Sequence, residues 1–301
     1  MSTVLERNDF SWIDKRVFPF EPNYLDVDGG QMHYVDTQGG RPIVFVHGWP
    51  TWSFSFRGVI RMLMKDFRCI APDLIGFGRS AKPENWRYSP GAHSQNLEAL
   101  INHLDLQDVT LVLHDFGGPV GLSYALENLD RVSRIVLMNT WMWDISDDPV
   151  ATRPAKLAQG PLGRMAYIKM NAAPKAIKSM FCDRDKYTDT VHEGYFGPFH
   201  RQEDRFGAFA VAKQLTEGSG WFADIWSNRH FLNGLPLQLV WGTQDNAFGE
   251  KAMNRIWHEF PLCDVKQFED SGRFVMEEHP QAVAEAIRSF MLAKHQAGYV
   301  A

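Results

Sequence analysis

The sequence predicts an α/β fold, with a mostly parallel twisted sheet, flanking helices and one inserted helical segment. Short apolar runs bounded by Gly, Pro or Asp recur along the chain, and helix-length stretches separate them. This pattern is typical of buried parallel strands joined by crossover connections. A long segment without strand signals, residues 146–231, interrupts the alternation. The 301 residues therefore indicate one α/β core with an insertion.

Each predicted element follows from its pattern of apolar residues. A strand is expected where a short apolar run is followed by a turn residue, and a helix where apolar residues recur three or four positions apart. In residues 90–104, for example, Leu100, Ile101 and Leu104 lie three, four and seven positions after Leu97. The predicted strands are residues 43–47, 69–72, 109–114, 134–139, 237–241 and 265–268, and the predicted helices are residues 90–104, 120–126 and 281–292.

The inserted segment is expected to form a helical cap. Five prolines break it into short helical stretches, and it is rich in Met, Phe and Trp. These side chains either pack the segment onto the core or wall an apolar pocket over the strand ends, where open α/β sheets bind ligands. We therefore expect an α/β core of residues 1–145 and 232–301 and a cap of residues 146–231.

Composition and charge exclude several classes of protein. A total of 31 Lys and Arg against 36 Asp and Glu gives a net charge of −5 without a dense basic run, so neither nucleic acid nor an anionic membrane is expected as a partner. No stretch reaches the roughly 18 apolar residues of a membrane span. Residues 1–15 lack the apolar core of a signal peptide, and Cys69, Cys182 and Cys263 are too dispersed for a disulfide framework. We expect a soluble cytoplasmic protein.

The strongest functional signal is a strand-to-helix turn at residues 113–118. Asp115 stands at its apex, directly after a predicted strand, and Gly117 two positions on relieves crowding around a strained backbone. This is the pattern of a nucleophile elbow, with Asp in place of the usual Ser. A lone Asp before a helix would instead be a helix N-cap, but other residues fit a site shared with Asp115.

These other residues follow further strands. In this architecture the loop after strand 43–47 supplies one backbone N–H of an oxyanion hole, here that of Trp49, and Phe116 supplies the second. Asp245 follows a later strand and would orient a base histidine, although a turn or helix-cap role is the alternative. The histidine itself is expected after the last strand.

Taken together, the motifs resemble the haloalkane dehalogenase branch of the α/β-hydrolase fold, over about residues 25–293. Epoxide hydrolases and the olefin-forming β-lactone decarboxylases share most of these motifs, so the fold does not choose among the three chemistries. The resemblance implies that Asp115 is the nucleophile. The matching motifs are HGWPTWSF at 47–54, APDLIGFGRS at 71–80, HDFGGP at 114–119, NTWMW at 139–143 and WGTQD at 241–245.

An Asp nucleophile narrows the reaction, because a carboxylate can attack saturated carbon and form an alkyl ester. In the hydrolytic members of the family, a histidine then activates water, and the oxyanion-hole N–H groups stabilise the tetrahedral intermediate. This chain has Trp49 where dehalogenases carry Asn, and Phe116 where they usually place a halide-binding Trp. The Phe side chain has no N–H to donate to a halide, so the indole of Trp49 or Trp141 is the candidate replacement.

The largest departure lies at the base. The family places His where this chain has Arg273, and a guanidinium stays protonated at neutral pH and cannot be a general base. His279 lies six positions on, before a proline expected to open the last helix, and is the weaker candidate. The chain is therefore an inactive or engineered variant, uses an unusual base, or catalyses a reaction that needs no water.

A β-lactone decarboxylase meets the last condition and is our first hypothesis. Asp115 would open a long-chain cis-dialkyl β-lactone, and loss of CO2 would then release a cis-alkene and regenerate the carboxylate. Arg273, held by Asp245, would bind the lactone oxygen or the nascent carboxylate. The olefin-forming enzymes are themselves described with an Asp-His-Asp triad, so Arg273 departs from that group as well. The partners implied are a small apolar substrate and other enzymes of the same pathway.

Three alternatives stay open. A haloalkane dehalogenase is favoured by the match at residues 50–54. An epoxide hydrolase would use cap tyrosines, for which Tyr167, Tyr187 and Tyr195 are candidates. A non-catalytic binding protein would have kept the pocket after losing the base. No phosphate loop, dinucleotide fingerprint or cluster of metal ligands is present in the sequence, so we predict no cofactor and no metal.

Overall fold

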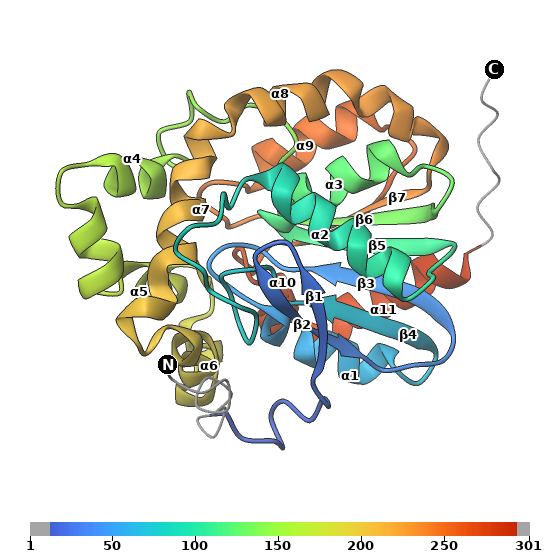
Figure 1. Cartoon of the computed structure of the whole chain (residues 1–301). Helices are drawn as coiled ribbons and strands as arrows, with labels where there is room; N and C mark the ends of the chain where they lie inside the picture. The colour runs from blue at the N-terminus through green and yellow to red at the C-terminus, as the bar shows by residue number, and fades with distance from the viewer. Residues whose placement is uncertain (1–12, 294–301) are drawn as a thin grey trace.

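The computed structural model describes residues 13–293 (Figure 1). Residues 1–12 and 294–301 lie outside this range, and so does most of the stretch in which we predict no signal peptide. Within the described range, eight strands form one sheet in the order β1-β2-β4-β3-β5-β6-β7-β8. The strands are β1 (Asn23–Val27), β2 (Gly30–Asp36), β3 (Arg41–Val46), β4 (Phe67–Pro72), β5 (Val109–Asp115), β6 (Val132–Thr140), β7 (Leu237–Gly242) and β8 (Asp264–Phe268).

The six predicted strands are β3 to β8, and they pair with one another in parallel. Every residue of β5 and β7 is buried, because helices cover both faces of the sheet. The mostly parallel α/β sheet is thereby confirmed. At the amino end the chain adds β1 and β2, an antiparallel hairpin that joins the sheet at β4 through pairs such as Tyr34 with Pro72.

Helices pack on both faces of the sheet. The predicted helices 90–104 and 281–292 are α2 (Pro90–His103) and α11 (Pro280–Leu292). The helix predicted at 120–126 is α3 (Gly117–Glu127), which starts earlier because the turn after Asp115 runs directly into it. α1 (Arg57–Leu63) packs with α11 on one face, and α2 with α3 on the other (Figure 1). No helix in the described range is long and apolar enough to cross a bilayer.

Two further core helices follow β7 and β8. α9 (Glu250–Glu259) packs against β6 and β7. The single turn α10 (Val275–Glu278) comes next, after the loop that carries Arg273, and leads into α11.

Between β6 and β7, residues 141–236 form only helices and turns, and we call them the helical insertion. The helices are α4 (Arg153–Gln159), the π-helical turn η3 (Met165–Lys169), α5 (Ala172–Ala176), α6 (Asp189–Phe196), α7 (Phe206–Glu217) and α8 (Ser219–Asn228), with 3-10 turns between them. Helices α4 to α7 gather at one end of the sheet, whereas α8 packs against α3 (Figure 1), and the chain enters the insertion from the carboxyl end of β6. The assignment of residues 146–231 as a separate cap stays a prediction.

Candidate active site

The backbone at Asp115 is strained. Asp115 ends β5 and has a φ of 49°, in the left-handed region that residues other than Gly seldom adopt. Gly117 allows the next turn to approach β3, because a Cβ there would lie 2.2 Å from the carbonyl oxygen of Val46. Thr140 at the end of β6 donates its hydroxyl to the carbonyl oxygen of Asp115 at 2.6 Å. The sharp turn therefore holds the Asp115 side chain at the carboxyl edge of the sheet.

Both predicted oxyanion-hole groups contact the Asp115 carboxylate. The backbone N–H of Trp49 donates to Asp115 Oδ1 at 2.9 Å, and that of Phe116 donates to the same oxygen at 2.7 Å. Gly48 permits this approach, since a Cβ at Gly48 would lie 2.3 Å from Asp115 Cβ. Two backbone donors thus hold one oxygen of a buried carboxylate.

The other oxygen of Asp115 faces Arg273. Arg273 Nη1 donates to Asp115 Oδ2 at 3.1 Å. Its Nε and Nη2 donate to Asp245 Oδ2 and Oδ1 at 2.9 and 3.0 Å, a bidentate pair. The structure therefore brings together Asp115, Asp245 and Arg273, far apart in sequence, and Asp245 orients an arginine rather than a histidine. Their catalytic roles stay predictions.

Ion pairing determines the ionisation of Asp245 and Arg273. Burial alone would raise the pKa of Asp245, but the charge and hydrogen bonds of Arg273 hold that pKa below its usual value. Burial opposes the charge on Arg273, yet Asp245 and Asp115 together raise the Arg273 pKa above its usual value. Arg273 is consequently a permanent cation between two carboxylates, with no proton to exchange with water near neutral pH.

Two polar residues that position the site were not among the predicted site residues. Asn139, at the end of β6, exchanges hydrogen bonds with the backbone of Gly242 and donates to the Phe248 carbonyl at 3.2 Å, which fixes the loop carrying Asp245. Glu278 Oε2 accepts from Ser271 Oγ at 2.9 Å and from the Gly272 N–H at 2.8 Å. The NTWMW motif was a signal for Asn139. No comparable motif contains Glu278.

Glu278 also ties the Arg273 loop to the helical insertion. Its Oε1 accepts from the backbone N–H of Asp183 at 2.7 Å, and the Arg273 N–H donates to the Met180 carbonyl at 3.1 Å. The Glu278 side chain is buried. One carboxylate therefore fixes both the turn before Arg273 and the insertion segment that covers it.

The indole groups differ in what they can still bind. Trp49 Nε1 donates to the Ala208 carbonyl of α7 at 2.8 Å, so this N–H is already used. Trp141 Nε1 is buried and has no partner. Trp141 stacks on Phe248 with ring centroids 4.6 Å apart, and the guanidinium of Arg273 lies 5.1 Å from the Phe248 centroid on the same ring. Trp141 is therefore the candidate donor to a bound ligand.

Neither nearby histidine replaces the base. His279 Nε2 lies 3.1 Å from Asp270 Oδ1, and its ring stacks on Phe268 at 5.1 Å, so it is engaged away from Asp115 and Asp245. His114 adjoins Asp115, but its Nε2 donates to the Arg273 carbonyl at 3.0 Å. Burial lowers the His114 pKa to about 4, which makes it a poor proton acceptor at neutral pH.

The three candidate cap tyrosines have partners outside this group. Tyr167 donates to the Pro154 carbonyl at 3.0 Å, and the Tyr187 hydroxyl lies 3.2 Å from His192 Nδ1. Tyr195 donates to Glu277 Oε1 at 2.6 Å. None of these contacts favours a role in protonating an epoxide at Asp115.

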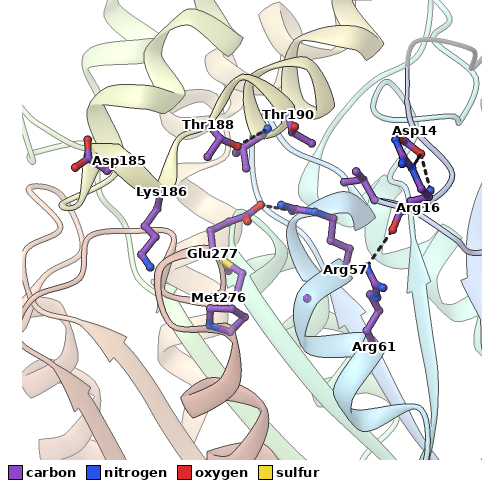
Figure 2. Close-up of a pocket in the computed structure, with 14 residues that line it drawn as sticks. Asp14, Arg16, Arg57, Arg61, Asp185, Lys186, Thr188, Thr190, Met276 and Glu277 are labelled. Carbon is purple, nitrogen blue, oxygen red and sulfur yellow. Dashed lines mark hydrogen bonds and ion pairs between the residues drawn. The ribbon is translucent and has the colours of Figure 1, made fainter.

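Glu277 belongs to a cavity of about 690 Å³ between the amino-terminal segment, α1, α10 and the start of α6 (Figure 2). The Arg57–Glu277 ion pair, 2.5 Å between Nη1 and Oε1, lies in the lining of this cavity, and Asp185 and Lys186 of the insertion also line it. None of the six predicted site residues lines it. Its polar lining of both signs differs from the apolar pocket that we predict for the substrate.

The comparisons with known proteins agree with this architecture. A family model for the alpha/beta hydrolase fold matches residues 41–280. The chain belongs to the alpha/beta hydrolase fold family. It is 29% identical over 288 residues to a cis-3-alkyl-4-alkyloxetan-2-one decarboxylase of Shewanella oneidensis, covering 91% of this chain and 89% of the relative. It is 30% identical over 277 residues to haloalkane dehalogenase 2 of Mycobacterium bovis, covering 91% and 96%.

A solved structure is similar over nearly the whole chain. The haloalkane dehalogenase DatA of Agrobacterium tumefaciens superposes with a TM-score of 0.81 at 26% identity, covering 90% of this chain and 96% of that one. The alpha/beta hydrolase fold and the likeness to the dehalogenase group, both expected from the motifs, are confirmed. The decarboxylase and the dehalogenase are nearly equally identical in sequence to this chain, so the choice between their activities rests on the chemistry of the site.

In this alpha/beta hydrolase the site offers a buried carboxylate, two backbone donors and one fixed cation. In residues 13–293 no three His, Cys, Asp or Glu side chains are grouped as a metal site requires. The arrangement suits attack by Asp115 on an activated carbon and stabilisation of a carboxylate that forms beside Arg273. A group suited to deprotonating water is missing from the contacts of Asp115 and Asp245 within the described residues.

Proposed function

We propose that this protein is a lyase that opens a long-chain cis-dialkyl β-lactone through Asp115 and releases CO2 to leave a cis-alkene. The observation that carries the proposal is the bidentate Arg273–Asp245 pair, in which the remaining nitrogen of Arg273, Nη1, donates to Asp115. A permanently charged group at the base position cannot activate water. A reaction that consumes no water is compatible with that arrangement, and the similarity to a β-lactone decarboxylase supports it.

In the first step, an oxygen of Asp115 attacks the ring carbon that bears the lactone oxygen. That carbon–oxygen bond breaks, an ester forms on Asp115, and the ring oxygen leaves as part of a carboxylate. Negative charge thus moves from Asp115 to the substrate, and Arg273 Nη1 loses its partner on Asp115. The same nitrogen is then available to the new carboxylate, while Asp245 keeps hold of Nε and Nη2.

In the second step, the bond between the substrate carboxylate and its neighbouring carbon breaks and CO2 leaves. Its electron pair forms the alkene, and the ester bond to Asp115 breaks with return of the carboxylate charge. Trp49, Phe116 and Arg273 all donate to that carboxylate, so they stabilise Asp115 as a leaving group. Backside attack followed by anti elimination converts a cis-lactone into a cis-alkene.

The same donors weaken Asp115 as a nucleophile, which bears on the substrate. Each hydrogen bond stabilises the free carboxylate relative to the attacking transition state. A strained four-membered ring is an activated electrophile, whereas an unstrained alkyl halide is not. This argument favours the lactone over the haloalkane.

Haloalkane dehalogenation is the second candidate. The unpartnered Trp141 N–H favours it, because an indole N–H can donate to a leaving halide. The 30% identical dehalogenase supports it equally with the decarboxylase. Among the described residues, no group suited to deprotonating water contacts Asp115 or Asp245, and this argues against hydrolysis of the alkyl ester that dehalogenation would form.

The test is gas chromatography of the products formed from a cis-dialkyl β-lactone, with Asp115→Ala as the blank. We expect cis-alkene in molar excess over enzyme, and none above the blank for Asp115→Ala. A trans-lactone should give the trans-alkene, if it reacts. Formation of a β-hydroxy acid, or no product above the blank, contradicts the proposal.

A further inference from the structure

The outer side of the helical insertion concentrates positive charge. Residues 149–182 contain six Lys or Arg residues and no Asp or Glu, although the whole chain has a net charge of −5. Acidic residues resume only at Asp183 and Asp185. All six basic side chains are exposed: Arg153, Lys156, Arg164, Lys169, Lys175 and Lys178.

Large apolar side chains are exposed on the same segment. Among the described residues, five of the twelve exposed large hydrophobic side chains fall within residues 150–170. Such clustering exceeds the scattered apolar residues of an ordinary surface. The five are Val150 (41% exposed), Leu157 (45%), Leu162 (62%), Met165 (42%) and Met170 (57%).

Basic and apolar side chains lie together on the exposed side of α4. In α4, Arg153, Lys156 and Leu157 are exposed at positions i, i+3 and i+4, while Ala155 and Ala158 are buried. α4 packs against α7, and α7 lies between α4 and the sheet (Figure 1). Leu162, Met165 and Lys169 continue the exposed spacing through η3. The exposed basic and apolar side chains of residues 150–178, on α4, η3, α5 and the adjoining turns, are called the α4–α5 face below.

Little negative charge compensates this face. Within residues 13–293, Arg164 is the one member of the six in an ion pair, with Glu84 at 2.7 Å, and both side chains of that pair are exposed. Lys175 donates to the Met170 carbonyl at 2.6 Å, which leaves its charge unpaired. The face therefore presents a local positive field that the net charge of the chain conceals.

We propose that the α4–α5 face docks on a bilayer that contains anionic lipid. Lys and Arg reach phosphate groups with their heads, while exposed Leu and Met side chains enter the boundary between headgroups and acyl chains. Charge complementarity favours this occupant over an apolar protein surface, where five unpaired cations would be desolvated. This proposal departs from the expectation of no membrane partner, which rested on the net charge of the whole chain. The proposal is independent of the reaction catalysed.

Vesicle flotation of the full-length protein tests it. We expect binding to phosphatidylcholine vesicles that contain phosphatidylglycerol, little binding to phosphatidylcholine alone, and release at high salt. The triple substitution Arg153→Gln, Lys156→Gln and Lys169→Gln should weaken binding at least about tenfold. The matched control neutralises three exposed lysines elsewhere, Lys65, Lys251 and Lys266, and should bind like the unaltered protein.

A second pair of variants tests whether apolar side chains enter the bilayer or whether the protein is held by electrostatic attraction alone. Leu162→Ser with Met170→Ser should weaken binding, whereas Met64→Ser with Leu262→Ser, two apolar residues exposed elsewhere, should not. Circular dichroism checks that each variant is folded. Equal binding to both vesicle types, no binding, or equal losses in cap and control variants overturns the proposal. Light scattering that reveals an oligomer lost only in Leu162→Ser with Met170→Ser, without lipid binding, assigns the face to a second copy of the chain instead.

Discussion

Arg273 and Asp245 form a buried two-hydrogen-bond pair, with Nε to Oδ2 at 2.9 Å and Nη2 to Oδ1 at 3.0 Å. This geometry uses one edge of the guanidinium and leaves Nη1 directed at Asp115. A histidine at residue 273 would have only two ring nitrogens and could not reproduce three such contacts. The Asp245–Arg273 pair therefore defines a site built to hold charge rather than to move protons.

Asp245→Asn should destabilise the fold. The amide offers one neutral acceptor where the carboxylate offered two charged ones, and a buried Arg273 is left less compensated, at a cost of roughly 3 kcal/mol. Urea unfolding followed by tryptophan fluorescence measures the change. Asp130→Asn, at an exposed position, is the control and should alter the unfolding free energy little. An unchanged midpoint for Asp245→Asn would show that the pair contributes no net stability.

Arg273→His should convert a stalled reaction with 1-bromohexane into a turning one. We expect the unaltered protein to be alkylated on Asp115 at most once, since no group activates water to cleave the ester. With histidine beside Asp245, bromide release should exceed the amount of enzyme. Intact-mass spectrometry detects the hexyl adduct, and a halide assay counts turnovers. Sustained bromide release by the unaltered protein would contradict this expectation and favour the dehalogenase alternative.

Glu278→Gln should impair turnover by displacing the Arg273 loop. The substitution leaves Oε1 as an acceptor for Asp183 but replaces the acceptor of Ser271 and Gly272 by an NH2 group. We expect kcat for alkene formation to fall about tenfold, with KM little changed. The free energy of unfolding should fall by about 1–3 kcal/mol. Glu277→Gln is the matched control, because Glu277 binds Arg57 and Tyr195 instead of this loop. If both variants lose turnover equally, the specific role of Glu278 fails.

The stability of the fold should decrease as the pH falls below 6.5. Burial, reinforced by His47, lowers the His93 pKa from 6.5 to about 3, and neither ring nitrogen of His93 has a partner. The unfolded chain binds a proton at His93 at a higher pH than the folded chain does. The free energy of unfolding that depends on neutral His93 is therefore full above pH 6.5 and is lost as the pH falls toward 3. His93→Phe should remove about 2 kcal/mol of the loss between pH 6.5 and 4.5.

Urea unfolding at several pH values measures this slope. The aromatic neighbours of His93, Trp86, Tyr88 and Phe116, should accept a phenyl ring in its place. His103→Gln, at an exposed position, serves as control and should leave the slope unchanged. A slope that is the same in His93→Phe and the unaltered protein would locate the sensitivity in other groups.

The sequence allowed prediction of β3 to β7 because most of their residues are buried, so that these strands read as apolar runs. β8, at the edge of the sheet, is largely exposed and does not follow this rule. β1 and β2 were not predicted, because β1 is only partly buried and polar residues interrupt the apolar residues of both strands, although Asp28-Gly29 between them is a hairpin signal. Asp115 and Asp245 were predictable since each follows a strand within a motif. The contact between Arg273 and Asp245 was also expected from the sequence, but the hydrogen bond from Arg273 to Asp115 was not, because it depends on how closely three strand ends approach.

The remaining differences also come from tertiary contacts. Composition could not reveal that the hydroxyl of Tyr195 is engaged by Glu277, or that the indole of Trp49 is engaged by Ala208. The charge of the α4–α5 face was visible in the sequence, but averaging over the chain concealed it. The net charge of a chain therefore does not determine the charge of one part of its folded surface.

The loop after β3 joins the nucleophile to the helical insertion. Trp49 donates its backbone N–H to Asp115 and its indole N–H to Ala208 of α7, and Trp52 donates its indole N–H to Gly194 of α6 at 2.7 Å. The loop that supplies a donor to Asp115 is therefore held in place by α6 and α7 as well as by the sheet. Any displacement of these two helices would be transmitted through the two indole rings to the backbone N–H at Asp115.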